Sequence, residues 1–184
     1  MGWLIALLAA SAVGWIIWTY NRLVLRRNRV STAWSDIDVQ LTRRHDLIPN
    51  LVSAVKAYAA HESATLAAVT TLRGHAMAEQ RPTKLGVIEG DIEKLLSRLL
   101  VLQEDYPELK ADQNFAQLSD TLVEVEDQLQ YARRYYNGAV RDLNTQIASF
   151  PDLIVATVLG FRQAEFYQAE GSHRDSVAVG NPGA

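Results

Sequence analysis

The chain has 184 residues, enough for one domain, and its formal charge of −3 is unevenly distributed. Residues 1–35 hold four arginines and no acidic residue, so +4 lies there and −7 lies on residues 36–184. An acidic domain makes a poor nucleic-acid binder, because such binding depends on lysine and arginine neutralising phosphates. The absence of cysteine excludes disulfides and thiolate metal sites and is compatible with a cytoplasmic domain.

The first element is an uncharged apolar segment, residues 3–20, with the sequence WLIALLAASAVGWIIWTY. As a helix it is about 27 Å long, comparable to the hydrocarbon core of a bilayer. Aromatic side chains near both ends suit the headgroup zone. The sequence therefore predicts a transmembrane anchor in residues 1–20. A cleaved signal peptide, with Ala10-Ser11-Ala12 as its cleavage site, is the alternative. It is disfavoured because no basic residue precedes the apolar run, which continues for eight residues past Ala12.

The orientation of the anchor is predicted from the arginines that follow it, Arg22, Arg26, Arg27 and Arg29. Positive charge is retained on the cytoplasmic side, so the N-terminus should lie outside the cytoplasmic membrane and the domain inside the cell. The inverted orientation stays open, because the short N-terminal flank gives few charges to compare. The same arginines are expected to contact anionic lipid headgroups, at about 1 kcal/mol each.

After the anchor, apolar residues recur at intervals of three and four, which predicts an all-α domain. The first such helix should cover residues 30–58. Pro49 removes a backbone hydrogen bond within it and should kink it locally. No breaker lies between Tyr20 and Val30, so anchor and first helix are predicted to be continuous. The apolar stripe of this helix consists of Val30, Trp34, Ile37, Leu41, Ile48, Leu51, Val55 and Tyr58, with a charge at Arg44.

Two further stripes follow a predicted linker at residues 74–83. Pro107 should open the third helix, and Pro151 should end it near Ser149 and begin a shorter helix over residues 151–167. These elements predict an antiparallel up-and-down bundle with heptad-patterned helices over residues 21–168, followed by a flexible tail, residues 169–184. The stripes are Leu85, Ile88, Ile92, Leu95, Leu99, Leu102 and Tyr106, then Phe115, Leu118, Leu122, Val125, Leu129, Ala132, Tyr136, Ala139 and Leu143.

No constellation in the sequence carries recognisable chemistry. His61-Glu62 begins like the zinc-protease motif HExxH, but Thr65 stands where the second histidine is required. Neither a histidine set with ligand spacing nor a glycine-rich phosphate loop is present. We therefore predict no catalytic, cofactor-binding or metal-binding residue. The enzymatic alternative is a hydrolase that uses Glu62, His61 or Asp46 in a crevice of the bundle.

Arg44 lies on the apolar face of its helix, where a charge is costly unless it is paired. We expect a carboxylate from a facing helix, Glu104, Glu124 or Glu126, to meet it. The alternatives are an arginine whose guanidinium reaches the edge of the bundle and, less favoured, a partner-binding surface.

The segment RRYYN, residues 133–137, mixes basic and aromatic side chains as some nucleic-acid readers do. Tyr136 belongs to the apolar stripe. The remaining residues are predicted to form a solvated helix face.

The string RRHDLIPNLVSAVKAY, residues 43–58, resembles the LemA family of bacterial membrane proteins. Further stretches agree in order: Trp34-Ser35-Asp36-Ile37, His61-Glu62, YPELKA at residues 106–111, RYYN at residues 134–137, then Asn144 and Phe150-Pro151. The resemblance covers about residues 18–167. It implies a single-pass anchor and a mostly four-helix bundle, without a known enzymatic activity. It also implies action beside a membrane zinc metalloprotease of the heat-shock type, and relatives in magnetosome membranes.

From these patterns we predict a non-enzymatic, membrane-anchored scaffold or adaptor that self-assembles or binds a membrane protein partner. No cofactor, nucleic acid or small-molecule substrate is expected. A membrane-remodelling oligomer is the second possibility, and the hydrolase is the third.

Overall fold

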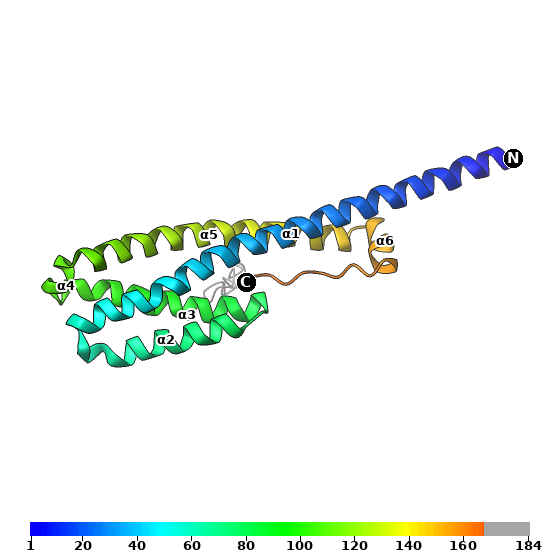
Figure 1. Cartoon of the computed structure of the whole chain (residues 1–184). Coiled ribbons are helices and arrows are strands. Elements are labelled where there is room, and N and C mark those ends of the chain that lie inside the picture. Colours follow the sequence, from blue (N-terminus) through cyan, green and yellow to red (C-terminus); the bar gives the residue numbers. More distant parts are fainter. Residues whose placement is uncertain (168–184) are drawn as a thin grey trace, which may run out of the picture. The chain divides into compact units, whose positions relative to one another are not determined.

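The computed structural model describes residues 1–167, and this part is all-α, as predicted (Figure 1). The predicted flexible tail lies outside the described residues. The helices in chain order are α1 (Gly2–Tyr58), α2 (Ser63–Ala78), α3 (Pro82–Val101), α4 (Pro107–Ala111), α5 (Gln113–Ala148) and α6 (Asp152–Val158). Two 3₁₀ turns, η1 (Ala60–Glu62) and η2 (Leu102–Glu104), stand between them.

The chain divides into two compact units, and the long helices α1 and α5 each contribute to both. Unit 1 consists of Met1–Leu47 and Asp120–Phe166, and unit 2 is built mainly from Ile48–Ser119.

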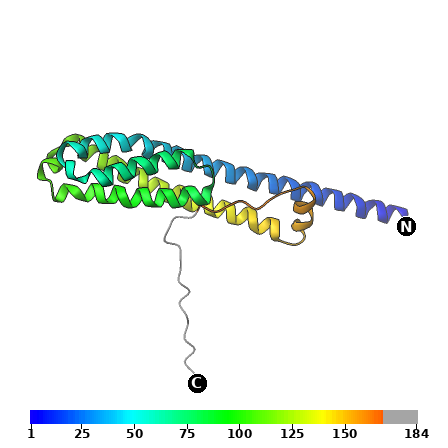
Figure 2. The same cartoon turned by 90° about the horizontal axis from the view of Figure 1, so that it is seen from below.

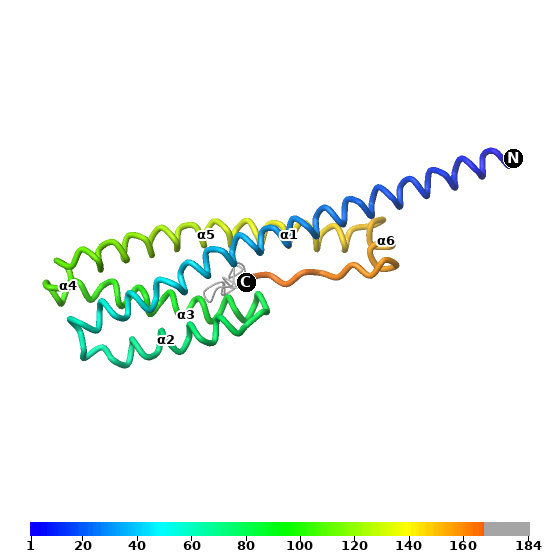
Figure 3. The backbone as a smooth tube through the Cα atoms, in the orientation of Figure 1, coloured from blue at the N-terminus to red at the C-terminus, as the bar shows by residue number. Residues whose placement is uncertain are grey.

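Helix α1 runs without interruption from the apolar segment into the folded part of the chain (Figure 3). The predicted continuity of anchor and first helix is therefore confirmed, and its cause is the absence of glycine and proline between Gly14 and Pro49. Pro49 itself lies inside α1, where Ser53 Oγ donates a hydrogen bond to the Pro49 carbonyl at 2.9 Å. The local kink at Pro49 stays a prediction.

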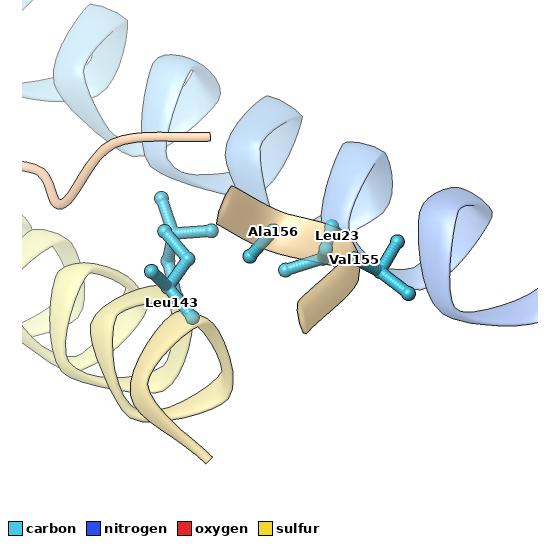
Figure 4. Packing of buried hydrophobic residues seen from close by; sticks show 5 residues of the cluster. Leu23, Leu143, Val155 and Ala156 are labelled. Atoms are coloured by element: carbon cyan, nitrogen blue, oxygen red, sulfur yellow. The ribbon is translucent and has the colours of Figure 1, made fainter. Parts of the chain in front are cut away.

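In unit 1, α5 runs antiparallel to α1, and α6 packs against both (Figures 1 and 2). The predicted stripes form most of its core. A separate cluster closes the end of this core beside α6, where five buried side chains from the three helices meet (Figure 4): Leu23, Leu143, Ile147, Val155 and Ala156.

In unit 2, α2 and α3 form an antiparallel hairpin (Figures 1 and 2). The prediction of a linker over residues 74–83 is wrong for its first half, because α2 continues through Gly74 to Ala78. The sequence reading missed α2 because small residues dilute its apolar stripe, of which Leu66, Val69 and Ala76 are buried. The α3 stripe places Leu85, Ile92 and Leu99 in the core as predicted, whereas its other members, Ile88, Leu95, Leu102 and Tyr106, are only partly buried and Leu96 is buried in place of Leu95.

The helix breaks near the two later prolines differ in part from the prediction. Pro107 opens only the short α4, and a new helix, α5, begins at Gln113. Its start is capped by Asp112, whose Oδ1 accepts a hydrogen bond from Phe115 N at 2.8 Å. The predicted end of α5 near Ser149 is confirmed.

The predicted helix over residues 151–167 is wrong in length, because α6 ends at Val158. Gly160 adopts a left-handed conformation with φ 71° directly after it, which is the usual way for glycine to terminate a helix. The chain then continues through residues 161–167 without helical structure.

Candidate functional site

The apolar start of α1 has the length and composition to cross a membrane. Its 18-residue window has a mean hydropathy of 1.7, and only 6% of that window is buried. A core helix of a soluble protein would bury such a surface against its neighbours. Here Trp3, Leu8 and Ile17 are among the large apolar side chains that stay exposed, so this segment is a candidate membrane-spanning helix.

The last turn of this apolar segment is joined to the core of unit 1 through a buried polar network. Thr19 is fully buried, and its Oγ1 donates a hydrogen bond to Asp152 Oδ1 at 3.3 Å. Gln146 Nε2 donates to the other oxygen, Asp152 Oδ2, at 3.1 Å. The sequence reading missed this network. Its signals are a threonine in a nearly all-apolar run and a single acidic residue, Asp152, in an otherwise uncharged stretch.

The arginines that follow the span contact aromatic rings and an acid in unit 1. The Arg22 guanidinium lies over the Trp18 ring at 5.1 Å from its centroid, and that of Arg27 lies over Phe161 at 5.6 Å. Such contacts are cation–π interactions. Arg26 Nη1 lies 3.1 Å from Asp142 Oδ2, and Arg29 is exposed. Their contact with anionic headgroups remains a prediction.

Arg44 is buried and is paired with Glu126, one of its three predicted partners, whose carboxylate is partly exposed. Its Nη1 donates to Glu126 Oε2 at 2.7 Å, and its side chain is 1% exposed. Arg133 Nη1 donates to the other oxygen, Glu126 Oε1, at 3.4 Å, and Gln130 Nε2 donates to that oxygen at 3.1 Å. We call Arg44, Glu126 and Arg133 the ion cluster. Glu124, another predicted partner, instead lies 3.7 Å from Arg43 at the surface.

One part of the prediction for residues 133–137 is wrong, because Arg133 is buried rather than solvated. Its position on α5 is one residue after Ala132, which the heptad pattern placed in the core and which is only partly buried. The Glu126 carboxylate, seven residues and thus about two turns earlier on the same helix, makes the inward position of Arg133 tolerable. Tyr136 is buried as predicted.

Two side chains of α5 hold the non-helical segment that follows α6. Asn144 Nδ2 donates to the Ala164 carbonyl at 2.9 Å, and Ala164 N donates to Asn144 Oδ1 at 2.8 Å. Tyr136 Oη donates to the Glu165 carbonyl at 2.9 Å, while its ring lies against Trp34 with a centroid distance of 5.3 Å. Burial, assisted by the negative charge of Glu165, raises the pKa of Tyr136 to about 12.

The residues of the enzymatic alternative do not form a recognisable site. His61 is exposed in the η1 turn, and Asp46 is exposed on α1. Within residues 1–167, no group of three or more histidine and acidic side chains could hold a metal ion. The neighbouring polar contact in unit 2 is structural: Tyr58 Oη donates to Asp112 Oδ2 at 2.9 Å. Hydrogen bonds from Phe115 N and then Tyr58 lower the pKa of Asp112, and the Asp112 carboxylate raises the pKa of Tyr58.

Comparison with known proteins points to one family. The model of the LemA family matches residues 33–180. Magnetosome protein MamQ 2 of Paramagnetospirillum magneticum is 25% identical over 179 residues, which cover 83% of this chain and 66% of that protein. Magnetosome protein MamQ of Magnetospirillum gryphiswaldense is 22% identical, with 83% of this chain and 65% of that protein covered. The chain thus spans slightly less than two thirds of the length of these relatives.

A further relative is Protein LemA of Metamycoplasma hominis, which is 25% identical over 158 residues, covering 85% of this chain and 72% of that protein. The matched region contains the ion cluster, the capped start of α5 and the paired hydrogen bonds between Asn144 and Ala164, which we call the Asn144 clamp. This chain belongs to the LemA family.

Proposed function

We propose that this protein is a non-enzymatic, membrane-anchored scaffold or adaptor. The observation that carries the proposal is α1, which joins an exposed apolar span to the buried interior of unit 1 without a break. Thr19 and Leu23, in the last turn of the span and the turn after it, are already core residues. A folded domain attached so rigidly to its anchor is held at a fixed height and orientation, which suits a protein that presents a binding surface beside a membrane.

We further propose that the span crosses the cytoplasmic membrane with the N-terminus outside and the helical domain in the cytoplasm. The four arginines after the span support this orientation. The partner would be a second copy of the chain or another membrane protein, with a membrane zinc metalloprotease of the heat-shock type among the candidates that family resemblance implies.

Cross-linking in native membranes tests the scaffold proposal. The full-length protein should appear in cross-linked species larger than the monomer, and mass spectrometry after solubilisation should identify the second component. The matched control replaces residues 3–14, all of them exposed, with leucines. This variant keeps an apolar span and should keep the partner if the domain recognises it. A strictly monomeric protein without partners would refute the proposal.

Membrane remodelling is the second candidate function. It is favoured by the large apolar side chains that α6 leaves exposed beside the anchor, because proteins that deform bilayers insert such side chains into one leaflet. Electron microscopy of the purified protein with lipid distinguishes the two functions, since only remodelling produces ordered or curved assemblies.

Replacing Asp46, His61 and Glu62 with alanine tests the hydrolase: an unaltered cellular phenotype in a folded variant ends that possibility.

A further inference from the structure

The segment around α6, residues 149–161, is unusual for the surface of a protein. Its thirteen residues, SFPDLIVATVLGF, contain one charged side chain, Asp152. That carboxylate points into unit 1, where Thr19 and Gln146 donate hydrogen bonds to both of its oxygens. The segment therefore presents no charge to its surroundings.

What the segment does present is large and apolar. Phe150 is 82% exposed and Val158 is 78% exposed; Leu153 and Ile154 between them and Leu159 after them are also exposed. The opposite side of α6 is occupied, because Val155 and Ala156 fill the cluster with Leu23 and Leu143 (Figure 4). We call the five exposed side chains the α6 face. Contiguous apolar surface of this kind marks an interaction with another apolar phase or molecule.

The position of α6 along α1 identifies that phase. Trp15 packs against the cluster that α6 completes, Thr19 bonds to Asp152, and the Tyr20 and Phe161 rings are 5.9 Å apart. Together with the contacts of Leu23 and Arg27 they fall on both sides of Tyr20, the last residue of the span. Because α1 rises about 1.5 Å per residue, α6 lies within about 12 Å of the level at which the span leaves the hydrocarbon.

The side chains around α6 have the chemistry of a membrane–water boundary. Trp18 and Tyr20 are exposed on α1 at the level of α6, and Arg22 and Arg27 lie against the rings of Trp18 and Phe161. Aromatic rings are typical of the headgroup zone of a bilayer, and so are arginines whose guanidinium groups extend from apolar surroundings toward water.

We propose that the α6 face is a second membrane contact, embedded at the boundary between acyl chains and headgroups of the bilayer that α1 crosses. The occupant of this face is lipid rather than a second protein. The face lies at the same level along α1 as the end of the span, and the exposed rings of Trp18 and Tyr20 lie beside it. The proposal rests on the anchoring of α1. It also explains the environment of Asp152: a carboxylate at this depth is tolerated because Thr19 and Gln146 donate hydrogen bonds to it on the side away from the lipid.

Single cysteines carrying an environment-sensitive fluorophore test this contact, and the absence of native cysteine makes the labelling specific. The full-length protein is reconstituted in phosphatidylcholine–phosphatidylglycerol vesicles. The test variants are Leu153→Cys and Val158→Cys, with Ile5→Cys as the anchor control and Val39→Cys as the water-facing control in unit 1; all four side chains are exposed. Each label is then challenged with nitroxide-labelled lipids and with aqueous iodide.

The labels at positions 153 and 158 should be quenched by nitroxide lipids, most strongly by nitroxides near the headgroup. Iodide quenching of these labels should fall several-fold below that of the Val39→Cys label. The Ile5→Cys label should respond best to nitroxides deep in the acyl region. Labels at 153 and 158 that follow the Val39→Cys label would overturn the α6 proposal while leaving the anchor intact.

Two other outcomes separate the remaining explanations. Labels at 153 and 158 that are shielded from both quenchers would indicate that protein covers the α6 face, which also overturns the proposal. An Ile5→Cys label that responds only to iodide would refute the anchoring of α1, and with it the proposed function. Circular dichroism of each variant confirms that the helical fold is retained.

Discussion

The two units of this protein bury polar side chains to different degrees. Unit 1 holds the ion cluster, the Thr19–Asp152–Gln146 network and the Asn144 clamp within or at the edge of its core. In unit 2 the side-chain bonds that involve Tyr58, Asp112 and Glu79 lie at helix ends near the surface, and among the described residues of that unit Glu89 is the buried charged one.

The difference follows from how each unit sets the register of its helices. Short connections at residues 79–81 and around α4 limit how the helices of unit 2 can slide. The parts of α1 and α5 in unit 1 carry heptad seams, which an apolar core alone would allow to pair one heptad out of register. We infer that the buried polar groups of unit 1 specify one register, which is the best attested use of such groups.

The largest expected effect comes from Glu126→Ala. This change leaves the buried guanidinium groups of Arg44 and Arg133 without their shared carboxylate, and should lower the free energy of unfolding by about 3–5 kcal/mol. The matched control is Glu124→Ala, which removes the exposed partner of Arg43 and should cost less than about 1 kcal/mol. Denaturant unfolding of the detergent-solubilised chain measures both. Equal effects would remove the distinction between buried and surface ion pairs in unit 1.

A smaller effect is expected from Asn144→Ala, which removes both hydrogen bonds to Ala164. The loss should be about 1–3 kcal/mol, because the backbone groups of Ala164 lose their partners. Amide hydrogen exchange at Ala164 should accelerate. Asn144→Asp retains an acceptor for Ala164 N and should be less disruptive; if the aspartate variant exchanges as fast as the alanine variant, the clamp contributes nothing through that bond.

Tyr136→Phe should lower the free energy of unfolding by about 0.5–1.5 kcal/mol, because only the hydrogen bond to the Glu165 carbonyl is lost.

The wild-type chain should also lose stability as the pH rises from about 10 to 12. The unfolded tyrosine ionises near pH 10, whereas the folded one retains its proton up to about pH 12. Thermal unfolding between pH 8 and 11.5 should show a smaller decline in the phenylalanine variant. Identical declines would contradict the raised pKa.

The smallest effect is expected in unit 2, at the exposed cap of α5. Asp112→Ala should lower the melting temperature at pH 7, whereas Asp112→Asn should preserve most of the cap. Because the folded-state pKa of Asp112 is lowered, its contribution is present above the ordinary pKa and is lost as the pH falls through the lowered value. The difference between wild type and Asp112→Ala should therefore shrink on acidification below about pH 4. A difference that is independent of pH would contradict this role.

The periodic features of the fold could be predicted from the sequence, whereas the polar contacts could be predicted only where a charge broke a pattern. Arg44 interrupts an apolar stripe, so its need for a carboxylate could be predicted, and Glu126 proves to be the one among three candidates that meets it. Arg133 lies beside the expected core position and becomes buried only because Glu126 is near it in three dimensions. Likewise, nothing local predicts that Asp152 meets Thr19, a residue 133 positions away. Helix α2 was missed because alanine and glycine give little periodic signal.

Helix α1 runs unbroken from the apolar segment into the core of unit 1, so under the proposed anchoring the bilayer would act mechanically on the folded part of the chain. A helix responds to a thinner membrane by tilting, and a tilt of residues 3–20 is transmitted to Leu41 and Arg44 because no joint absorbs it. Under the proposed anchoring, lipid thickness would thereby change the tilt of the helical core of unit 1 relative to the membrane plane. The surface that we propose is presented to a partner would then tilt with the thickness of the membrane.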